Sequence, residues 1–239
     1  MTGPAPGERP APATEDVASY AGRSKYDAPG RAARYEARSR RRDAEEKALL
    51  DRVLDVLALP RGARALDAPC GTGRIAQALL ARGWSVTAAD LSPAMREAAR
   101  AALSSAAAAV TVEPIDLEAT PPPDAPRHDV VVCFRFFHHL PDDAARTRVL
   151  RSLAARARGP VVLSFHHPVS VHHLARALRR LLTRRRGDRH ATTVAHLRRL
   201  AREAGLAVRR TAALAPYRRD LWVAVLEAAP AAGTASGGG

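Results

Sequence analysis

The stretch "ALDAPCGTGRIAQALLARGWSVTAADLS", residues 65–92, decides the fold that we predict for this chain. It opens with an apolar strand that ends at Asp67, continues through the glycine-rich turn "PCGTG", and enters a helical segment. A second strand, "SVTAAD", follows and ends at Asp90. Gly71 and Gly73 let the backbone turn tightly and come close to a ligand at the start of the helix. The stretch therefore predicts a strand–turn–helix–strand unit with a ligand site at the turn.

Strands and helices continue to alternate along the rest of the chain. We expect further strands at 109–116, 128–137, 160–167, 207–215 and 221–228, and helices at 93–103, 142–158 and 193–204. Strands followed by helical or connecting segments imply a parallel sheet that is wrapped by helices. The last two strands are joined only by "PYRRD", which is too short for a parallel crossover. They therefore form an antiparallel hairpin at one edge of the sheet.

The sequence predicts one central domain with flanking segments. The expected boundaries are a disordered N-terminal segment at 1–16, a helical cap at 17–62, the domain itself at 63–230 with a basic amphipathic insertion at 169–190, and a flexible tail at 231–239. Within the cap, apolar residues recur at helical spacing, namely Leu49, Leu50, Val53, Leu54 and Leu57.

Composition narrows the class of protein without identifying a partner. The net charge of +14 is almost entirely arginine, since Lys25 and Lys47 are the two lysines in 239 residues. In a chain this rich in alanine and arginine, part of the positive charge fits a bias in composition, so an anionic partner stays open and the charge is not used to predict one. Cys70 and Cys133 give no disulfide framework and favour a reducing compartment. No apolar run reaches membrane-spanning length, and the N-terminus lacks the apolar stretch of a signal peptide, so we expect a cytoplasmic protein.

The acids around the glycine turn favour a nucleoside-containing cofactor without a pyrophosphate. Asp90 lies 17 residues after Gly73, a spacing that suits a carboxylate accepting both hydroxyls of a ribose. Asp67 directly precedes the turn, where it would repel a pyrophosphate and attract an ammonium group. The turn also lacks the third glycine typical of dinucleotide sites. No Gly-Lys-Ser/Thr follows it, which excludes a P-loop.

Three segments carry a family resemblance: "ALDAPCGTGR", "VTAADLSPAM" and "FHHLPDD". They resemble the class I S-adenosylmethionine-dependent methyltransferases, in particular the small-molecule type related to ubiquinone and menaquinone biosynthesis. The resemblance implies an α/β, Rossmann-like, seven-stranded sheet that is mostly parallel, with an antiparallel C-terminal hairpin and helices on both faces. It also implies S-adenosyl-L-methionine as cofactor and methyl transfer as the activity.

The family's cofactor contacts fall on residues at the ends of the predicted strands. The implied cofactor-binding residues are Asp67, Pro69, Gly71, Gly73, Arg74, Asp90, Leu91, Asp116, Leu117, Phe134 and Arg135. Asp67 and the glycines would hold the methionine end, Asp90 the ribose, and Asp116 the adenine. Phe134 and Arg135 would form the wall of the methyl-transfer site. Each acid taken alone also fits a helix or turn cap, and Leu91 and Leu117 also fit a purely structural role in the core.

Histidine pairs supply the candidate catalytic residues. The pairs His138-His139 and His166-His167 follow the fourth and fifth strands, and a third pair, His172-His173, lies further on. His138, His139 and His166 are our candidates for a general base, with structural hydrogen bonding as the alternative for each. We expect no metal site, because adjacent residues on a strand point to opposite faces and ligate poorly together.

The predicted partner is a small-molecule acceptor, methylated at oxygen, nitrogen or carbon. The basic segment at 171–186 reads as an amphipathic helix, which fits a solvated cover of the sheet edge, a substrate lid or peripheral contact with a membrane. The basic stretches hold almost no aromatic residues for stacking bases, which argues against nucleic acid. An RNA methyltransferase and a non-catalytic S-adenosylmethionine-binding regulatory protein remain as alternatives.

Overall fold

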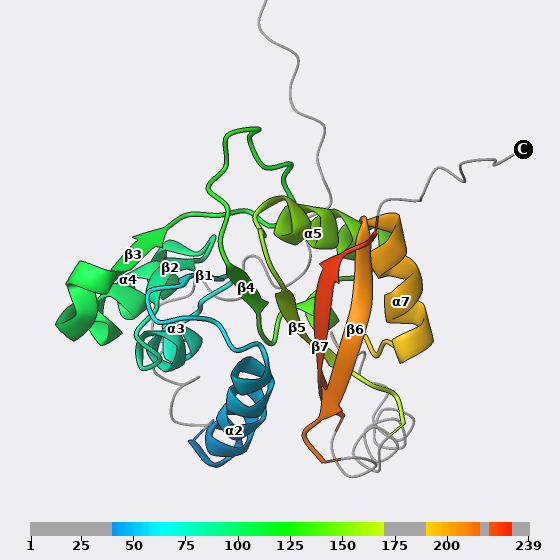
Figure 1. Ribbon diagram of the computed structural model, residues 1–239, viewed down its shortest axis with the longest axis horizontal. Coiled ribbons are helices and arrows are strands. Elements are labelled where there is room, and N and C mark those ends of the chain that lie inside the picture. Colours follow the sequence, from blue (N-terminus) through cyan, green and yellow to red (C-terminus); the bar gives the residue numbers. More distant parts are fainter. Residues whose placement is uncertain (1–39, 170–189, 216–219, 231–239) are drawn as a thin grey trace, which may run out of the picture.

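A computed structural model describes residues 40–169, 190–215 and 220–230 of the chain. The predicted N-terminal segment at 1–16, the cap before residue 40, almost all of the insertion at 169–190 and the tail at 231–239 lie outside the described residues. Figure 1 shows the described part as one sheet with helices packed against it.

The sheet has seven strands in the order β3-β2-β1-β4-β5-β7-β6. The strands are β1 (Arg64–Asp67), β2 (Ser85–Ala89), β3 (Val110–Glu113), β4 (Val130–Cys133), β5 (Val161–His166), β6 (Leu206–Ala213) and β7 (Leu221–Ala228). The first five are parallel, whereas β7 runs antiparallel to both β5 and β6. The predicted mixed sheet with a reversed C-terminal hairpin is confirmed.

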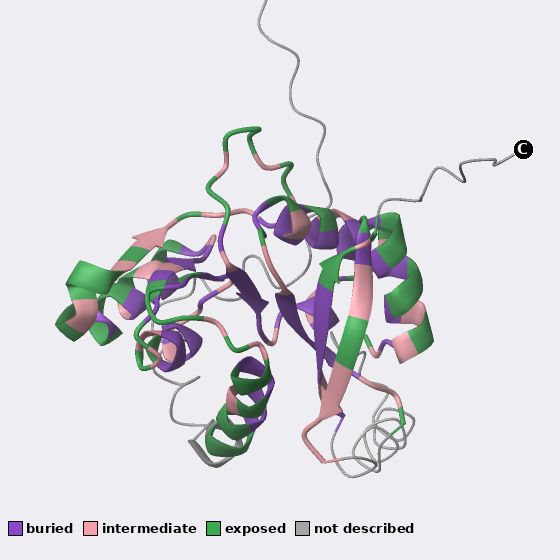
Figure 2. Ribbon diagram, in the orientation of Figure 1, coloured by how far each residue is buried: buried purple, intermediate pink, exposed green. Residues whose placement is uncertain are grey.

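Helices cover both faces of this sheet. On one face, α2 (Arg40–Val56), α3 (Arg74–Leu80) and α4 (Pro93–Ala102) contribute apolar side chains to one core layer. On the other face, α5 (Asp143–Ala155) and α7 (Val194–Glu203) pack against the second layer. Two 3-10 turns, η1 (Ser104–Ala109) and η2 (Phe137–His139), join elements at the margins. Figure 2 shows buried central strands and helices that are buried only on the side facing the sheet.

The fourth strand is shorter than the sequence predicts. The prediction covered 128–137, but β4 ends at Cys133. Arg135 adopts a left-handed backbone with φ 59°, which no strand residue can take, and η2 follows directly. Phe136 and Phe137 are nevertheless buried, at 7% and 0% exposure. The apolar residues that predicted a longer strand therefore enter the core from a turn.

Gly159 marks the close approach between the start of β5 and the chain before β4. A Cβ placed on Gly159 would lie 2.3 Å from the backbone oxygen of Asp129, a contact that only a backbone shift can relieve. We therefore expect Gly159→Ala to lower the free energy of unfolding by about 1–3 kcal/mol. Chemical denaturation would measure this, with Arg158→Ala at the exposed neighbouring position as control. Equal stability of the two variants would contradict this account of the contact.

Candidate functional site

The glycine turn lies between the ends of β1 and β2. The amide of Cys70 donates to the oxygen of Ala89 at 2.8 Å, and the amide of Gly73 donates back to the oxygen of Cys70 at 3.0 Å. Gly71 and Gly73 take φ values of 55° and 85°, a left-handed backbone that favours glycine. The Ala68–Pro69 peptide bond is cis. The predicted tight turn is therefore present at the carboxyl edge of the sheet, where open α/β folds bind ligands.

Asp90 ties this turn to the end of β2. Its Oδ2 accepts the amide of Gly71 at 2.9 Å, and its Oδ1 accepts the amide of Ser92 at 2.9 Å. The alternative role of Asp90 as the cap of α4 is wrong, since Ser92 is the N-cap residue and accepts the amide of Met95. A carboxylate oxygen can accept more than one hydrogen bond, so positioning the turn is compatible with a contact between Asp90 and a ligand.

Asp67 is the most unusual group of the site. It is 0% exposed, and neither of its carboxyl oxygens accepts a hydrogen bond within the part of the chain that the structure describes. Burial raises the pKa of Asp67 to about 8. The nearby amide of Ala76 opposes this rise. The negative charge of Asp90 adds to the rise, and the positive charge of Arg74 opposes it. Asp67 does not cap α3, whose N-cap residue is Gly73. A buried carboxyl group without a hydrogen-bond partner in the described residues therefore lies beneath the turn, and a cation bound there would supply that partner.

The third strand brings Asp116 to the same edge. Asp116 lies three residues beyond the end of β3 and is half-buried, and its Oδ1 accepts the amide of Glu118 at 2.9 Å. Leu117 is 4% exposed and belongs to the apolar core on the α5 side. Leu91 is half-buried after β2, and its oxygen accepts Arg96 at 2.8 Å. The core role of Leu117 is therefore established, whereas a contact with adenine stays a prediction.

The residues after β4 meet the helix that follows the glycine turn. The guanidinium of Arg74 lies 6.0 Å from the ring centre of Phe134. The amide of Arg135 donates to Ser164 Oγ at 2.6 Å, which anchors its left-handed backbone to β5. Arg74 and Arg135 both reach Glu46 Oε2, at 3.5 Å and 3.2 Å. One carboxylate from α2 is thus shared by two arginines near the carboxyl edge of the sheet.

Glu46 is a site residue that the sequence prediction missed. It is 7% exposed, and it precedes Leu49, Leu50 and Val53 by three, four and seven residues. An acid in line with an apolar helical stripe is a signal of a buried ion pair, because charged residues are rarely fully buried without a partner. The stripe itself was recognised, but its acidic member was not.

The predicted histidines converge at the ends of β4 and β5. The rings of His138 and His166 stack with centroids 3.9 Å apart and planes 6° apart, and both residues are buried. His139 is half-buried, with its ring centroid 4.2 Å from that of His138. Asp220, which the sequence prediction also missed, places Oδ2 3.4 Å from His166 Nδ1. The signal was available, because an antiparallel β7 must begin where the parallel β5 ends.

The predictions about metal ligands and membrane spans can be compared with the described residues only. No group of three or more potential metal ligands occurs within residues 40–169, 190–215 and 220–230, and His172-His173 lies outside them. No helix in the same ranges is long and apolar enough to cross a membrane.

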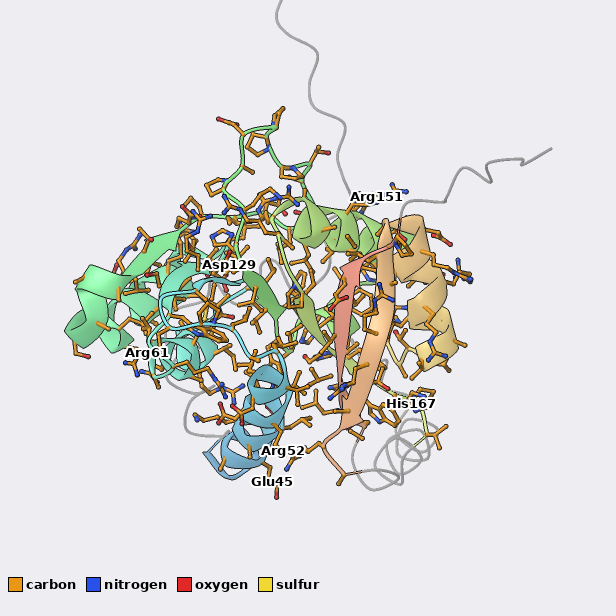
Figure 3. All side chains as sticks on the ribbon, in the orientation of Figure 1. Glu45, Arg52, Arg61, Asp129, Arg151 and His167 are labelled. Atoms are coloured by element: carbon orange, nitrogen blue, oxygen red, sulfur yellow. The ribbon has the colours of Figure 1, made fainter. Side chains whose placement is uncertain are left out.

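Figure 3 places Glu45 of α2 and His167 after β5 toward one end of the molecule, with Asp129 and Arg151 toward the other.

Comparison with known proteins agrees with this architecture. Residues 65–158 match a family described as "Methyltransferase domain". The ubiquinone biosynthesis O-methyltransferase of Alkalilimnicola ehrlichii is 33% identical over 115 residues, which are 48% of this chain and 46% of that protein. The enzyme of the same name from Pseudomonas aeruginosa is 33% identical over 141 residues, 55% of this chain and 60% of that one. The chain thus matches about half the length of these curated relatives.

Solved structures show the same fold over more of the chain. The magnesium protoporphyrin IX methyltransferase of Synechocystis, solved with bound SAH, superposes with a TM-score of 0.72 at 18% identity, covering 87% of this chain and 98% of that one. The O-methyltransferase NcsB1 from neocarzinostatin biosynthesis gives a TM-score of 0.57 at 22% identity, with 70% of this chain and 50% of that one covered. Residues 65–158 are therefore similar to a methyltransferase domain, and the described residues share the fold of these solved methyltransferases.

The buried carboxyl of Asp67 predicts a specific dependence of stability on pH. Its pKa is about 8 in the folded chain and near 3.9 when unfolded, so the folded state holds a proton that the unfolded state releases. This stabilisation is complete below pH 4 and is lost as the pH rises through 8. We expect Asp67→Asn to be more stable than the unmodified chain at pH 9, by a few kcal/mol at most at about 1.4 kcal/mol per pKa unit.

The advantage of Asp67→Asn should shrink steadily toward pH 4. Chemical denaturation at several pH values would measure it, with Asp124→Asn at an exposed loop position as the matched control. A stability difference that stays constant between pH 4 and pH 9 would show that Asp67 does not hold the proton.

Proposed function

We propose that the chain is a methyltransferase that transfers the methyl group of S-adenosyl-L-methionine to a small-molecule acceptor. The observation that carries this proposal is the fully buried carboxyl group of Asp67, below a glycine turn that Asp90 holds in place. A cofactor with an ammonium group and a ribose, and without a pyrophosphate, satisfies both acids. The methyltransferase domain at residues 65–158 supports the same reading.

The residues present fit this cofactor. Asp67 and the backbone of Gly71 and Gly73 would hold its methionine end, Asp90 its ribose, and Asp116 with Leu91 and Leu117 its adenine. Pro69, Arg74, Phe134 and Arg135 would line the remainder. When bound, the cofactor supplies an electrophilic methyl group on a sulfonium, and the protein contributes mainly alignment of the acceptor. His138, His139 and His166 stand beside this edge as candidates for accepting the acceptor's proton.

The comparisons favour a small acceptor. The curated relatives are named as O-methyltransferases of ubiquinone biosynthesis, and NcsB1 was solved with 1,4-dihydroxy-2-naphthoic acid. Peripheral membrane contact through residues 171–186 and a cytoplasmic location remain part of this proposal. RNA methylation and a purely regulatory, cofactor-binding role are the outcomes that the assay below separates from it.

Loss of the carboxylate at residue 90 should remove most cofactor affinity. We expect Asp90→Asn to weaken binding of S-adenosylhomocysteine by about tenfold to a hundredfold, because charged hydrogen bonds are worth about 1.5–3 kcal/mol. An asparagine oxygen can still accept one of the two backbone amides that Asp90 accepts. Isothermal titration calorimetry on the full chain measures this, and Asp124→Asn is the control. Equal affinity of both variants would remove Asp90 from the site.

Cofactor binding should also release a proton from Asp67. At pH 7 this carboxyl is protonated in the free protein, and an ammonium group placed against it would favour the ionised form. Calorimetry in buffers of different ionisation enthalpy should therefore report release of about one proton per S-adenosylhomocysteine bound. Asp67→Asn should abolish that release. Identical proton release in the variant would place the ammonium group elsewhere.

A labelling assay identifies the class of acceptor. Purified protein is incubated with tritiated-methyl S-adenosylmethionine and, separately, with a small-molecule extract and with total RNA. We expect label in the small-molecule fraction, and much less label with Asp90→Asn. Label in RNA alone would replace the proposal with an RNA methyltransferase, and cofactor binding without any labelling would favour the regulatory alternative.

A further inference from the structure

We infer that Glu46 of α2 keeps the guanidinium of Arg74 away from Asp67, and that it thereby keeps the site for the cofactor's ammonium group open. The inference rests on the proposed function and adds to that site a residue from outside the segment that matches the methyltransferase family. Glu46 is a positioning residue, because it acts on Asp67 only through Arg74. A buried carboxyl group near a guanidinium normally pairs with it, and Asp67 does not.

Asp67 is the acid that a neighbouring guanidinium would be expected to bind. It is fully buried, and within residues 40–169, 190–215 and 220–230 neither of its oxygens accepts a hydrogen bond. Burial raises its pKa to about 8 and the charge of Arg74 opposes that rise, so the two groups lie in each other's field. Arg74 directly follows Gly73 and is the first residue of α3. An ion pair between Arg74 and Asp67 would occupy the place proposed for the ammonium group.

Glu46 and Phe134 hold Arg74 in a different direction. Nη2 of Arg74 lies 3.5 Å from Glu46 Oε2, and its Cζ lies 6.0 Å from the ring centre of Phe134. Glu46 is 7% exposed, so its negative charge needs cations close by. A move of Arg74 to Asp67 would leave the buried charge of Glu46 with less compensation. The contact with Glu46 is therefore favoured over the contact with Asp67.

Arg135 gives Glu46 a second and well-anchored partner. Its Nη1 lies 3.2 Å from Glu46 Oε2, and its amide donates to Ser164 Oγ at 2.6 Å. The backbone of Arg135 is thus fixed to β5, and its guanidinium helps to fix the carboxylate of Glu46. Arg74 is the arginine whose field reaches Asp67, so Arg74 is the one that would close the site.

The other ionisable groups in the field of Asp67 do not decide which cation binds there. The negative charge of Asp90 favours a cation of either kind. Cys70 in the glycine turn and Cys133 at the end of β4 also lie in the field of Asp67. Burial raises the pKa of both thiols far above their usual range, so neither ionises near neutral pH. The position of Arg74 therefore decides whether a guanidinium or an ammonium group meets Asp67.

The pKa of Asp67 in the cofactor-free protein reports where Arg74 lies. Carboxyl ¹³C spectra of the labelled full chain, recorded across a range of pH, measure this pKa, and Asp67→Asn assigns the signal. We expect the wild-type value to be about 8. Glu46→Gln should lower it by about 1–3 pH units, the usual effect of an arginine next to an aspartate, and adding Arg74→Gln should restore it. Glu97→Gln, on α4 with a side chain that is 79% exposed, is the matched control.

A wild-type Asp67 that is already ionised at pH 6 would overturn the inference without any variant. A pKa that is unchanged in a folded Glu46→Gln protein would overturn it as well. Restoration by Arg135→Gln in place of Arg74→Gln would show that the wrong arginine is assigned. These spectra need no cofactor, so they separate the two levels of the argument. If S-adenosylhomocysteine fails to bind the wild type, the proposed function fails, whereas the spectra still decide whether Glu46 holds Arg74.

Calorimetry with S-adenosylhomocysteine connects this contact to cofactor binding. Glu46→Gln should weaken binding by about tenfold, because the ammonium group must then displace Arg74 from Asp67. The same substitution in an Arg74→Gln background should weaken binding by less than about threefold. Proton release at pH 7 should fall below about half a proton in Glu46→Gln, since Asp67 is already ionised. Equal losses of affinity in both backgrounds would indicate a general effect of charge or stability and would overturn the role of Glu46.

Discussion

The burial of a carboxyl group at the end of β1 is the constraint on which the rest of the site depends. Asp67 is enclosed completely, and the second carboxyl of the site, that of Asp90, raises its pKa further. The protein tolerates this because the glycine turn closes over Asp67 and because the oxygens of Asp90 accept two backbone amides. Such an arrangement destabilises the free protein, and a cation bound against Asp67 would reduce that destabilisation. Local strain of this kind is typical of binding sites.

Pairing of buried charges also explains where α2 lies. Arg74 follows the glycine turn, Arg135 follows β4, and both contact the single carboxylate of Glu46. A buried glutamate without partners would oppose docking of α2, whereas two guanidiniums offset part of the cost of burying its charge. Apolar contacts of Leu49, Leu50 and Val53 then hold the helix against the sheet. The position of α2 is therefore coupled to the chain segments that follow the glycine turn and β4.

Much of the fold could be predicted from the sequence, because periodicity and turn chemistry are local. The last strand was predicted at 221–228, which is where β7 lies. The hairpin followed from the length of its loop alone. The end of β4 was wrong, since an apolar run does not distinguish a strand from a buried turn, and the left-handed Arg135 leaves no sequence signal. Glu46 and Asp220 each carried a sequence signal, one in an apolar helical stripe and the other before an antiparallel strand, but their partners come from distant segments that only the tertiary structure identifies.

The reversed strand has a chemical consequence as well as a topological one. At the end of β5, His166 turns toward His138 while His167 stacks on Trp222 at 4.6 Å. This dipeptide thus contributes only one ring to the cluster, whereas His138 and His139 lie in the turn η2 and both contribute. The acid beside that ring must come from another strand. Because β7 is antiparallel to β5, its first residue pairs with the last residue of β5, and Asp220 directly precedes it. A parallel strand in the same position would bring the chain after Ala228 to this edge instead, where no acid follows in the sequence. The strand order β4-β5-β7, and not proximity in sequence, is what brings two histidines and a carboxylate together where β4 and β5 end.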